Sequence, residues 1–93
     1  MRLRWEVFAL DDLDRIAEFN ERRSAALARQ VQNQIVARAE KLVAAPRGGR
    51  PIPGTEDRAV LIADMQYVLI YAVTADEILV RSVHSTREAG APG

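Results

Sequence analysis

The chain has 93 residues with 13 basic and 13 acidic side chains, so one domain (1–93) with a thin core and zero net charge is expected. This charge balance argues against a protein that acts mainly by binding nucleic acid, because such proteins are usually basic. The lack of cysteine excludes disulfides, and because neither a long apolar run nor a signal peptide is evident, we expect a cytoplasmic protein with no membrane partner.

The first elements in the chain are a strand and a helix. Apolar and charged residues alternate from Arg2 to Phe8, which predicts a half-buried strand. From Ala9 to Asn20 the apolar residues recur at helical spacing. Asp11, Asp12 and Asp14 stand near the start of this helix, where acids favour its positive end, so we interpret them as dipole partners and not as metal ligands.

A second helix follows a short polar break. Ser24 is a suitable N-cap residue for it. Apolar residues then repeat by three and four over five turns, which predicts one face against a core: Ala28, Val31, Ile35, Ala39 and Leu42. Because the break is short, an antiparallel pair of helices is expected.

The segment from Pro46 to Gly54 is rich in proline and glycine. It predicts a loop inside the domain, without regular structure. Arg47 and Arg50 lie in this loop, and we expect both to point into solvent, where partner contacts are often made.

Three strands complete the chain, at Arg58–Ala63, Tyr67–Val73 and Ile78–His84, joined by short turns. Because Tyr67–Val73 is apolar on both faces, it is expected to be central. Residues 85–93 are expected to form a flexible tail. The predicted fold is α+β: an N-terminal strand, an antiparallel two-helix hairpin, and a three-stranded antiparallel meander with the helices packed on one sheet face.

The ordered set of residues over Leu3 to Arg87 resembles the ParE/RelE toxins of type II toxin–antitoxin systems. It consists of Trp5, Asp12-Leu13 with Ile16, Leu42 before Pro46, Gly49-Arg50, Arg58, Tyr67, Tyr71, and Val83-His84 followed by Arg87. The resemblance implies that an antitoxin covers the helices and the sheet. RelE-like members cleave messenger RNA and ParE-like members act on DNA gyrase, so the choice between them has to be made on individual residues.

A metal-independent nuclease needs a base, an acid and cations at one place. The candidates are His84, Arg87, Arg58 and Arg81, with Arg50 as a further cation and Tyr67 or Tyr71 as proton donor. In a simple meander, however, Arg58 and His84 stand about 15–20 Å apart. A purely structural role is therefore an alternative to catalysis at every one of these positions. On that interpretation Tyr67, Tyr71 and Trp5 are core residues, and Arg58 pairs with Asp57 or Glu56. Arg81 is then solvated, and His84 is a surface residue at the end of a strand.

A domain this small is not expected to bury all of its apolar side chains in its own core. We expect Phe8, Leu10 and Phe19 to form partner surface, together with Arg47, Arg50 and Arg87, against an acidic antitoxin. No pattern predicts a cofactor or a metal site.

These observations favour a ParE-like toxin that inhibits gyrase and is neutralised by a ParD-like antitoxin, in a homodimer or a toxin–antitoxin hetero-oligomer. The alternatives are a RelE-like ribonuclease and a non-toxic member that acts only in an antitoxin repressor complex.

Overall fold

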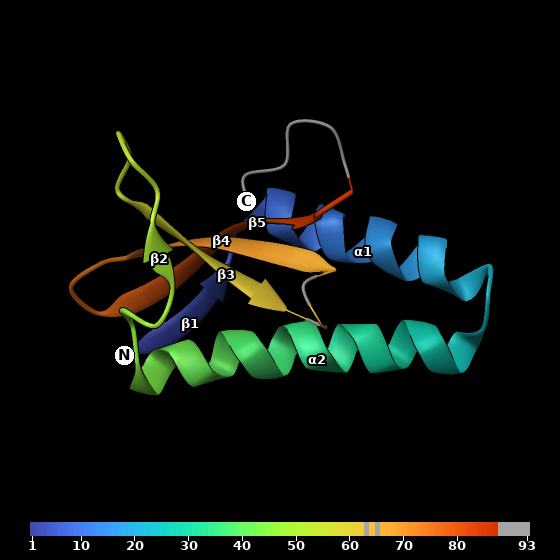
Figure 1. Cartoon of the computed structure of the whole chain (residues 1–93). Helices are drawn as coiled ribbons and strands as arrows, with labels where there is room; N and C mark the ends of the chain where they lie inside the picture. The colour runs from blue at the N-terminus through green and yellow to red at the C-terminus, as the bar shows by residue number, and fades with distance from the viewer. Residues whose placement is uncertain (63, 65, 88–93) are drawn as a thin grey trace.

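The structure is a computed structural model, and it describes residues 1–62, 64 and 66–87. Its elements are β1 (Arg2–Trp5), α1 (Val7–Glu21), α2 (Ala25–Ala44), β2 (Arg50–Pro51), β3 (Asp57–Ile62), β4 (Tyr67–Val73) and β5 (Glu77–Ser85). Figure 1 shows the two helices running in opposite directions beside a twisted sheet. The predicted α+β fold with an antiparallel helical hairpin is confirmed.

The sheet has the strand order β1-β5-β4-β3-β2. Strands β3, β4 and β5 form the predicted antiparallel meander, while β1 adds to the outer side of β5 in parallel. Every residue of β4 except Val73 is buried, as expected for a central strand with two apolar faces.

The main core lies between the helices and one face of the sheet. It joins the apolar stripes of α1 and α2 to alternate residues of β3, β4 and β5, with Leu3 and Trp5 of β1 packed at its side. Each Val, Leu or Ile that is fully buried there contributes about 1.5–3 kcal/mol. The opposite face carries a small cluster of Ala59, Val68 and Ile70, with Ile52 of the loop against it.

The first strand is shorter than predicted, and the first helix begins earlier. Strand β1 ends at Trp5, and α1 already begins at Val7. The last pairing bond of this segment runs from the Glu6 N–H to the Val80 carbonyl at 2.9 Å. The alternation that continues to Phe8 in the sequence is therefore misleading: Val7 and Phe8 are helical and largely exposed.

This shift changes the role of the acidic run. The first turn of α1 holds no acidic residue, so the expected dipole interaction of Asp11, Asp12 and Asp14 is wrong. Asp12 instead accepts a hydrogen bond from the Val83 N–H at 2.9 Å and forms an ion pair with Arg15 at 3.1 Å. It therefore links α1 to the part of β5 that β1 does not pair.

The second helix follows the prediction closely. The Ser24 hydroxyl accepts a hydrogen bond from the Leu27 N–H at 2.9 Å, and the five predicted apolar positions are all buried. The chain leaves this helix at Ala45, whose N–H donates to the Lys41 carbonyl. Within the described residues, no helix is long and apolar enough to span a bilayer.

Two expectations about irregular segments need correction. The Pro46–Gly54 loop contains the short edge strand β2, in which Arg50 pairs with Ala59 and Pro51 with Arg58. An edge strand tolerates proline because one side of it needs no ladder bond. The predicted tail begins too early, because Ser85 still belongs to β5 and the Thr86 N–H donates to the Gln66 carbonyl at 2.9 Å. The rest of the predicted tail, 88–93, lies outside the described residues.

Candidate protein-interaction site

The residues proposed for a nuclease do not gather in one place. Arg58 pairs across the sheet with Tyr71, whereas His84 pairs with Val68, which in turn faces Leu61. Arg58 and His84 are therefore separated by roughly 10 Å along the strands and by two strand spacings of about 4.8 Å. Alternation also puts them on opposite faces, because Arg58 shares the side of the core residue Val60 and His84 lies next to the core residue Val83.

Each of these two side chains has a local hydrogen bond. The Arg58 Nη1 donates to the Gly49 carbonyl at 2.8 Å, so the expected pairing of Arg58 with Asp57 or Glu56 is wrong. The His84 Nε2 lies 3.0 Å from the Ser82 hydroxyl. Neither arrangement brings a base and a cation together.

Arg81 is held by two carboxylates on the helix-free face of the sheet. Its Nε donates to Asp57 at 2.8 Å and its Nη1 to Glu6 at 3.0 Å, so the expectation of a solvated Arg81 is wrong. The hydrogen bond to Asp57 raises the pKa of Arg81 despite the opposing effect of burial. A β-bulge explains this placement, since Ile70 pairs with Ser82 and Tyr71 with Val80, which leaves Arg81 as the extra residue.

The two tyrosines are core residues, as expected. The Tyr71 hydroxyl donates to the Pro46 carbonyl and accepts from the Gly49 N–H, both at 2.8 Å. The Tyr67 hydroxyl accepts from the Asn20 side-chain amide at 3.1 Å. The Tyr71 bonds hold the loop after α2 on the sheet, and the Tyr67 bond holds the end of α1 on it. Tyr71 therefore has a structural role.

The predicted apolar contact residues of α1 are exposed. Phe8 is 73%, Leu10 47% and Phe19 57% accessible to solvent. Phe8 and Phe19 are separated by eleven residues, about three turns, so they share one face of the helix. Leu10 lies on the other side of the buried stripe, so the three side chains do not form a single patch.

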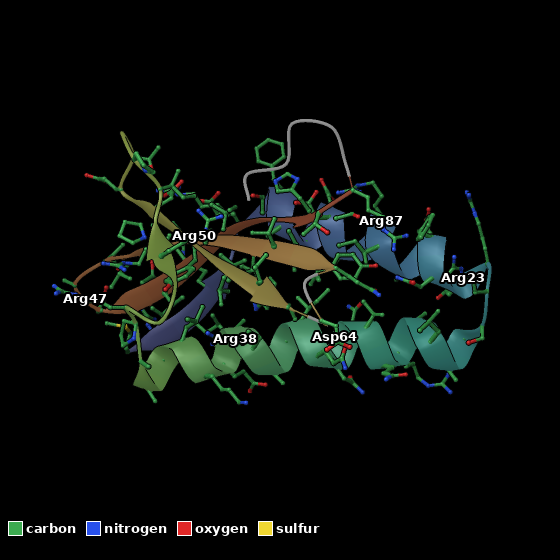
Figure 2. The ribbon with its side chains drawn as sticks, viewed as in Figure 1. Arg23, Arg38, Arg47, Arg50, Asp64 and Arg87 are labelled. Atoms are coloured by element: carbon green, nitrogen blue, oxygen red, sulfur yellow. The ribbon has the colours of Figure 1, made fainter. Side chains whose placement is uncertain are left out.

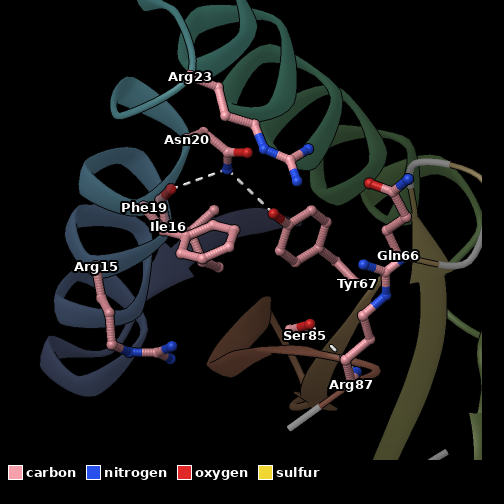
Figure 3. A pocket seen from close by; sticks show the side chains of 9 residues that line it. All are labelled: Arg15, Ile16, Phe19, Asn20, Arg23, Gln66, Tyr67, Ser85 and Arg87. Carbon is pink, nitrogen blue, oxygen red and sulfur yellow. Dashed lines mark hydrogen bonds between the residues drawn. The ribbon is translucent and has the colours of Figure 1, made fainter.

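A cavity of about 470 Å³ opens next to Phe19, and we call it the Tyr67 cavity (Figure 3). It lies where the end of α1, the start of β4 and the end of β5 meet. Its lining residues are Arg15, Ile16, Phe19, Asn20, Arg23, Gln66, Tyr67, Ser85 and Arg87. The volume is in the range of about 300–1,000 Å³ that is typical of ligand pockets.

The lining of the Tyr67 cavity combines an apolar floor with a cationic rim. Ile16, Asn20 and Tyr67 are buried, whereas the three arginines are exposed and no lining residue is acidic. Arg15 pairs with Asp12, but within the described residues neither Arg23 nor Arg87 forms an ion pair. Such a site suits a ligand that is both apolar and anionic. No group of His, Asp or Glu in the described part of the chain could hold a metal ion.

Sequence reasoning found only part of this site. It identified Phe19 and Arg87 but missed Arg15, Arg23 and the polar floor residue Asn20. The spacing of Arg15, Phe19 and Arg23 by four residues was a usable signal, because such positions follow one side of a helix. Asn20 at a core position was a second signal, because a buried amide needs hydrogen-bond partners.

The loop arginines form a separate group. Arg47 and Arg50 are both exposed, as expected, and Figure 2 shows them at the opposite end of the molecule from Arg23 and Arg87. The three predicted partner arginines therefore fall into two groups, with Arg47 and Arg50 toward one end of the molecule and Arg87 toward the other.

Comparison with known proteins identifies the family. A model of the ParE toxin of type II toxin–antitoxin systems, parDE, matches residues 3–90. A relative in Sinorhizobium fredii (strain NBRC 101917 / NGR234), named "Putative toxin Y4kP", is 28% identical over 87 residues, which cover 94% of this chain and 91% of that protein. The fold is similar to a solved structure of the chromosomal ParDE TA system from P. aeruginosa, with a TM-score of 0.81, 24% identity, and coverage of 91% of this chain and 95% of that one. The chain therefore belongs to the ParE toxin family of type II toxin–antitoxin systems.

Proposed function

We propose that this protein inhibits DNA gyrase in the cytoplasm and is silenced by a cognate ParD-like antitoxin in a toxin–antitoxin hetero-oligomer. The observation that carries the proposal is a contrast in the arginines. Of the arginines suggested for catalysis, Arg58 and Arg81 make internal contacts. Arg87, the third of them, lines an open cavity together with Arg23, next to the exposed Phe19. The chain presents binding surface where a nuclease would present a catalytic cluster.

The ribonuclease alternative has little support from the geometry. A general base and the cations that stabilise a phosphate transition state must lie within a few ångströms of one reacting group. Here Arg58 and His84 lie on opposite faces of the sheet, and Arg81 is neutralised by Asp57 and Glu6. The alternative of a non-toxic member that only binds its antitoxin has no structural feature that favours it over the toxin.

Two assays on the same preparations test the proposal. The chain is expressed with and without a candidate ParD-like protein, sought in the neighbouring reading frames. Growth is followed together with messenger RNA integrity. Purified protein is then assayed for inhibition of gyrase supercoiling. We expect growth arrest that the antitoxin relieves, loss of supercoiling activity, and intact messenger RNA.

His84→Ala is the matched control for the alternative chemistry. A gyrase inhibitor should tolerate this change, because His84 is not one of the residues that line the Tyr67 cavity. Messenger RNA cleavage that disappears in His84→Ala would establish the ribonuclease and overturn the proposal. Growth that never slows without the antitoxin would favour the non-toxic alternative.

A further inference from the structure

We propose that the Tyr67 cavity receives one bulky apolar side chain from an acidic segment of a partner protein, with carboxylates on both sides of that side chain bound by Arg23 and Arg87. If the proposed function holds, this segment belongs to the antitoxin. The inference specifies the chemistry of the partner, which family membership alone does not.

The floor of the cavity calls for an apolar group. Asn20 is the polar residue there, and its amide nitrogen already donates to the Ile16 carbonyl at 2.9 Å and to the Tyr67 hydroxyl at 3.1 Å. In the described residues no buried side-chain N or O atom lacks a hydrogen-bond partner. Of the hydrogen-bonding capacity of Asn20 and Tyr67, only the Asn20 carbonyl oxygen and the Tyr67 hydroxyl hydrogen stay available. The rest of the floor is apolar, and the ring of Phe19 extends its apolar wall into solvent. An inserted aliphatic or aromatic side chain would remove this surface from water.

The rim of the cavity calls for negative charge. Arg23 comes from the turn after α1 and Arg87 from the turn after β5, so two segments far apart in the sequence place a guanidinium at the same opening (Figure 3). Neither pairs with an acid among the described residues. A guanidinium binds a carboxylate through two parallel hydrogen bonds, and such a pair gains strength where an interface excludes water.

Arg15 shows how the third cation is positioned. Its Nη2 lies 3.1 Å from Asp12, which also accepts the Val83 N–H, so the pair is tied to the edge of β5. Arg15 is therefore a fixed wall of the opening, and Arg23 and Arg87 are the cations for an incoming carboxylate.

The site favours a peptide over a nucleic acid. A nucleic acid strand needs a continuous basic track along its phosphates. The chain as a whole is neutral, and Arg47 and Arg50 lie at the other end of the molecule and cannot extend the rim (Figure 2). A short acidic segment with one large apolar residue matches the size and the charge of a single cavity.

A random peptide library displayed on phage tests the inference without knowledge of the antitoxin. Peptides are selected on the wild-type chain and counter-selected on Arg23→Glu/Arg87→Glu. We expect enrichment of a Leu, Ile, Phe or Trp with Asp or Glu within about four residues on each side. Enriched peptides without acids, or no enrichment dependent on the two arginines, would overturn the inference.

Affinity measurements with a selected peptide provide the matched controls. Each of Arg23→Glu and Arg87→Glu should weaken binding by about tenfold or more. Arg29→Glu makes the same charge change at an exposed site of α2 outside the cavity. The affinity of this variant for the peptide should stay within about twofold of the wild-type affinity. Urea unfolding of each variant shows that it is folded. Peptides in which lysine replaces the acids should recover binding to Arg23→Glu/Arg87→Glu, which a merely structural role of the arginines would not produce.

Two outcomes separate this inference from the proposed function. If the ParD-like protein binds the wild type and Arg23→Glu/Arg87→Glu equally well, the antitoxin claim stands and the cavity inference fails. If no ParD-like protein binds but acidic peptides do, the cavity inference stands and the antitoxin claim fails. Binding of single-stranded RNA with the same dependence on Arg23 and Arg87 would overturn the inference in favour of a nucleic-acid site.

Discussion

The two ends of β4 carry the same kind of residue in two different settings. Tyr67 and Tyr71 lie on the same face of the strand, both are buried, and both belong to the core against the helices. The Tyr71 hydroxyl is closed in by the loop after α2, through Pro46 and Gly49. Within the part of the chain that the structure describes, the Tyr67 hydroxyl has a hydrogen bond only with Asn20, and the Tyr67 cavity opens beside it.

This difference shows that the same residue type on the same strand face can be covered or can border a cavity. The neighbouring segments of the chain decide which of the two occurs. At the Tyr71 end, the loop lies so close that an added Cβ on Gly49 would be 2.8 Å from the Ala59 carbonyl and from the Tyr71 ring. At the Tyr67 end, α1 finishes at Glu21 and the chain turns away into α2. One end is thus closed by the loop, and the other is open, where we propose that a partner binds.

The largest expected effect is at the closed end. Gly49→Ala puts a methyl group against the backbone of Ala59, which cannot move aside cheaply, and against Tyr71. We expect a loss of about 3 kcal/mol in the free energy of unfolding, at the upper end of usual overpacking costs. Urea unfolding followed by the fluorescence of Trp5, the only tryptophan, measures it.

Gly48→Ala is the neighbouring control. A Cβ at Gly48 would lie 3.1 Å from the Ala45 carbonyl and farther from the other side chains nearby, so a small shift accommodates it. Its cost should be clearly lower than that of Gly49→Ala. Equal costs for the two variants would mean that the loop is not tightly closed over Tyr71.

Tyr71→Phe should be the next most costly change. It removes the partner of the buried Gly49 N–H and of the Pro46 carbonyl in one step. Leaving a buried N–H without a partner costs about 1–3 kcal/mol, and we expect about 2 kcal/mol here. Hydrogen exchange at Gly49 should also accelerate, whereas exchange in the middle of α2 should follow only the change in global stability.

Tyr67→Phe should cost less, about 1 kcal/mol. It removes one hydrogen bond from Asn20, whose amide keeps its bond to the Ile16 carbonyl. Because the floor becomes more apolar, binding of an acidic peptide with an apolar residue should persist. A loss of stability as large as that of Tyr71→Phe would contradict the contrast between the two ends, and the same urea titration decides it.

Much of the closed end could be predicted from the sequence. The two apolar faces of Tyr67–Val73 predict a central strand, and the repeat from Ala28 to Leu42 predicts the face of α2 that covers it; both predictions are confirmed. These patterns succeed because burial follows the period of the backbone. The start of α1 was misplaced because the end of β1 is set by pairing to Val80, a contact across 74 residues that no local pattern contains.

The open end was harder to predict for the same reason. Phe19 and Arg87 were expected to contact a partner, but nothing in the sequence placed them together. The pairing of Ser85 with Tyr67 brings Arg87 to the end of α1, and the bulge at Arg81 sets which residues of β5 face the core. A cavity formed by three distant segments becomes visible only when the register of the sheet is known.

The smallest expected effect on stability is at the rim of the open end. Arg87→Ala should change the free energy of unfolding by less than about 0.5 kcal/mol, because within the described residues its side chain forms no ion pair or hydrogen bond. Arg81→Ala is the matched control, since it leaves Asp57 and Glu6 without their shared cation and should cost about 1 kcal/mol. Arg87→Ala should nevertheless weaken partner binding, whereas Arg81→Ala should not. If Arg87→Ala destabilised the chain as much as Arg81→Ala, Arg87 would be a structural residue, and the contrast between an end that stabilises the fold and an end that binds a partner would no longer hold.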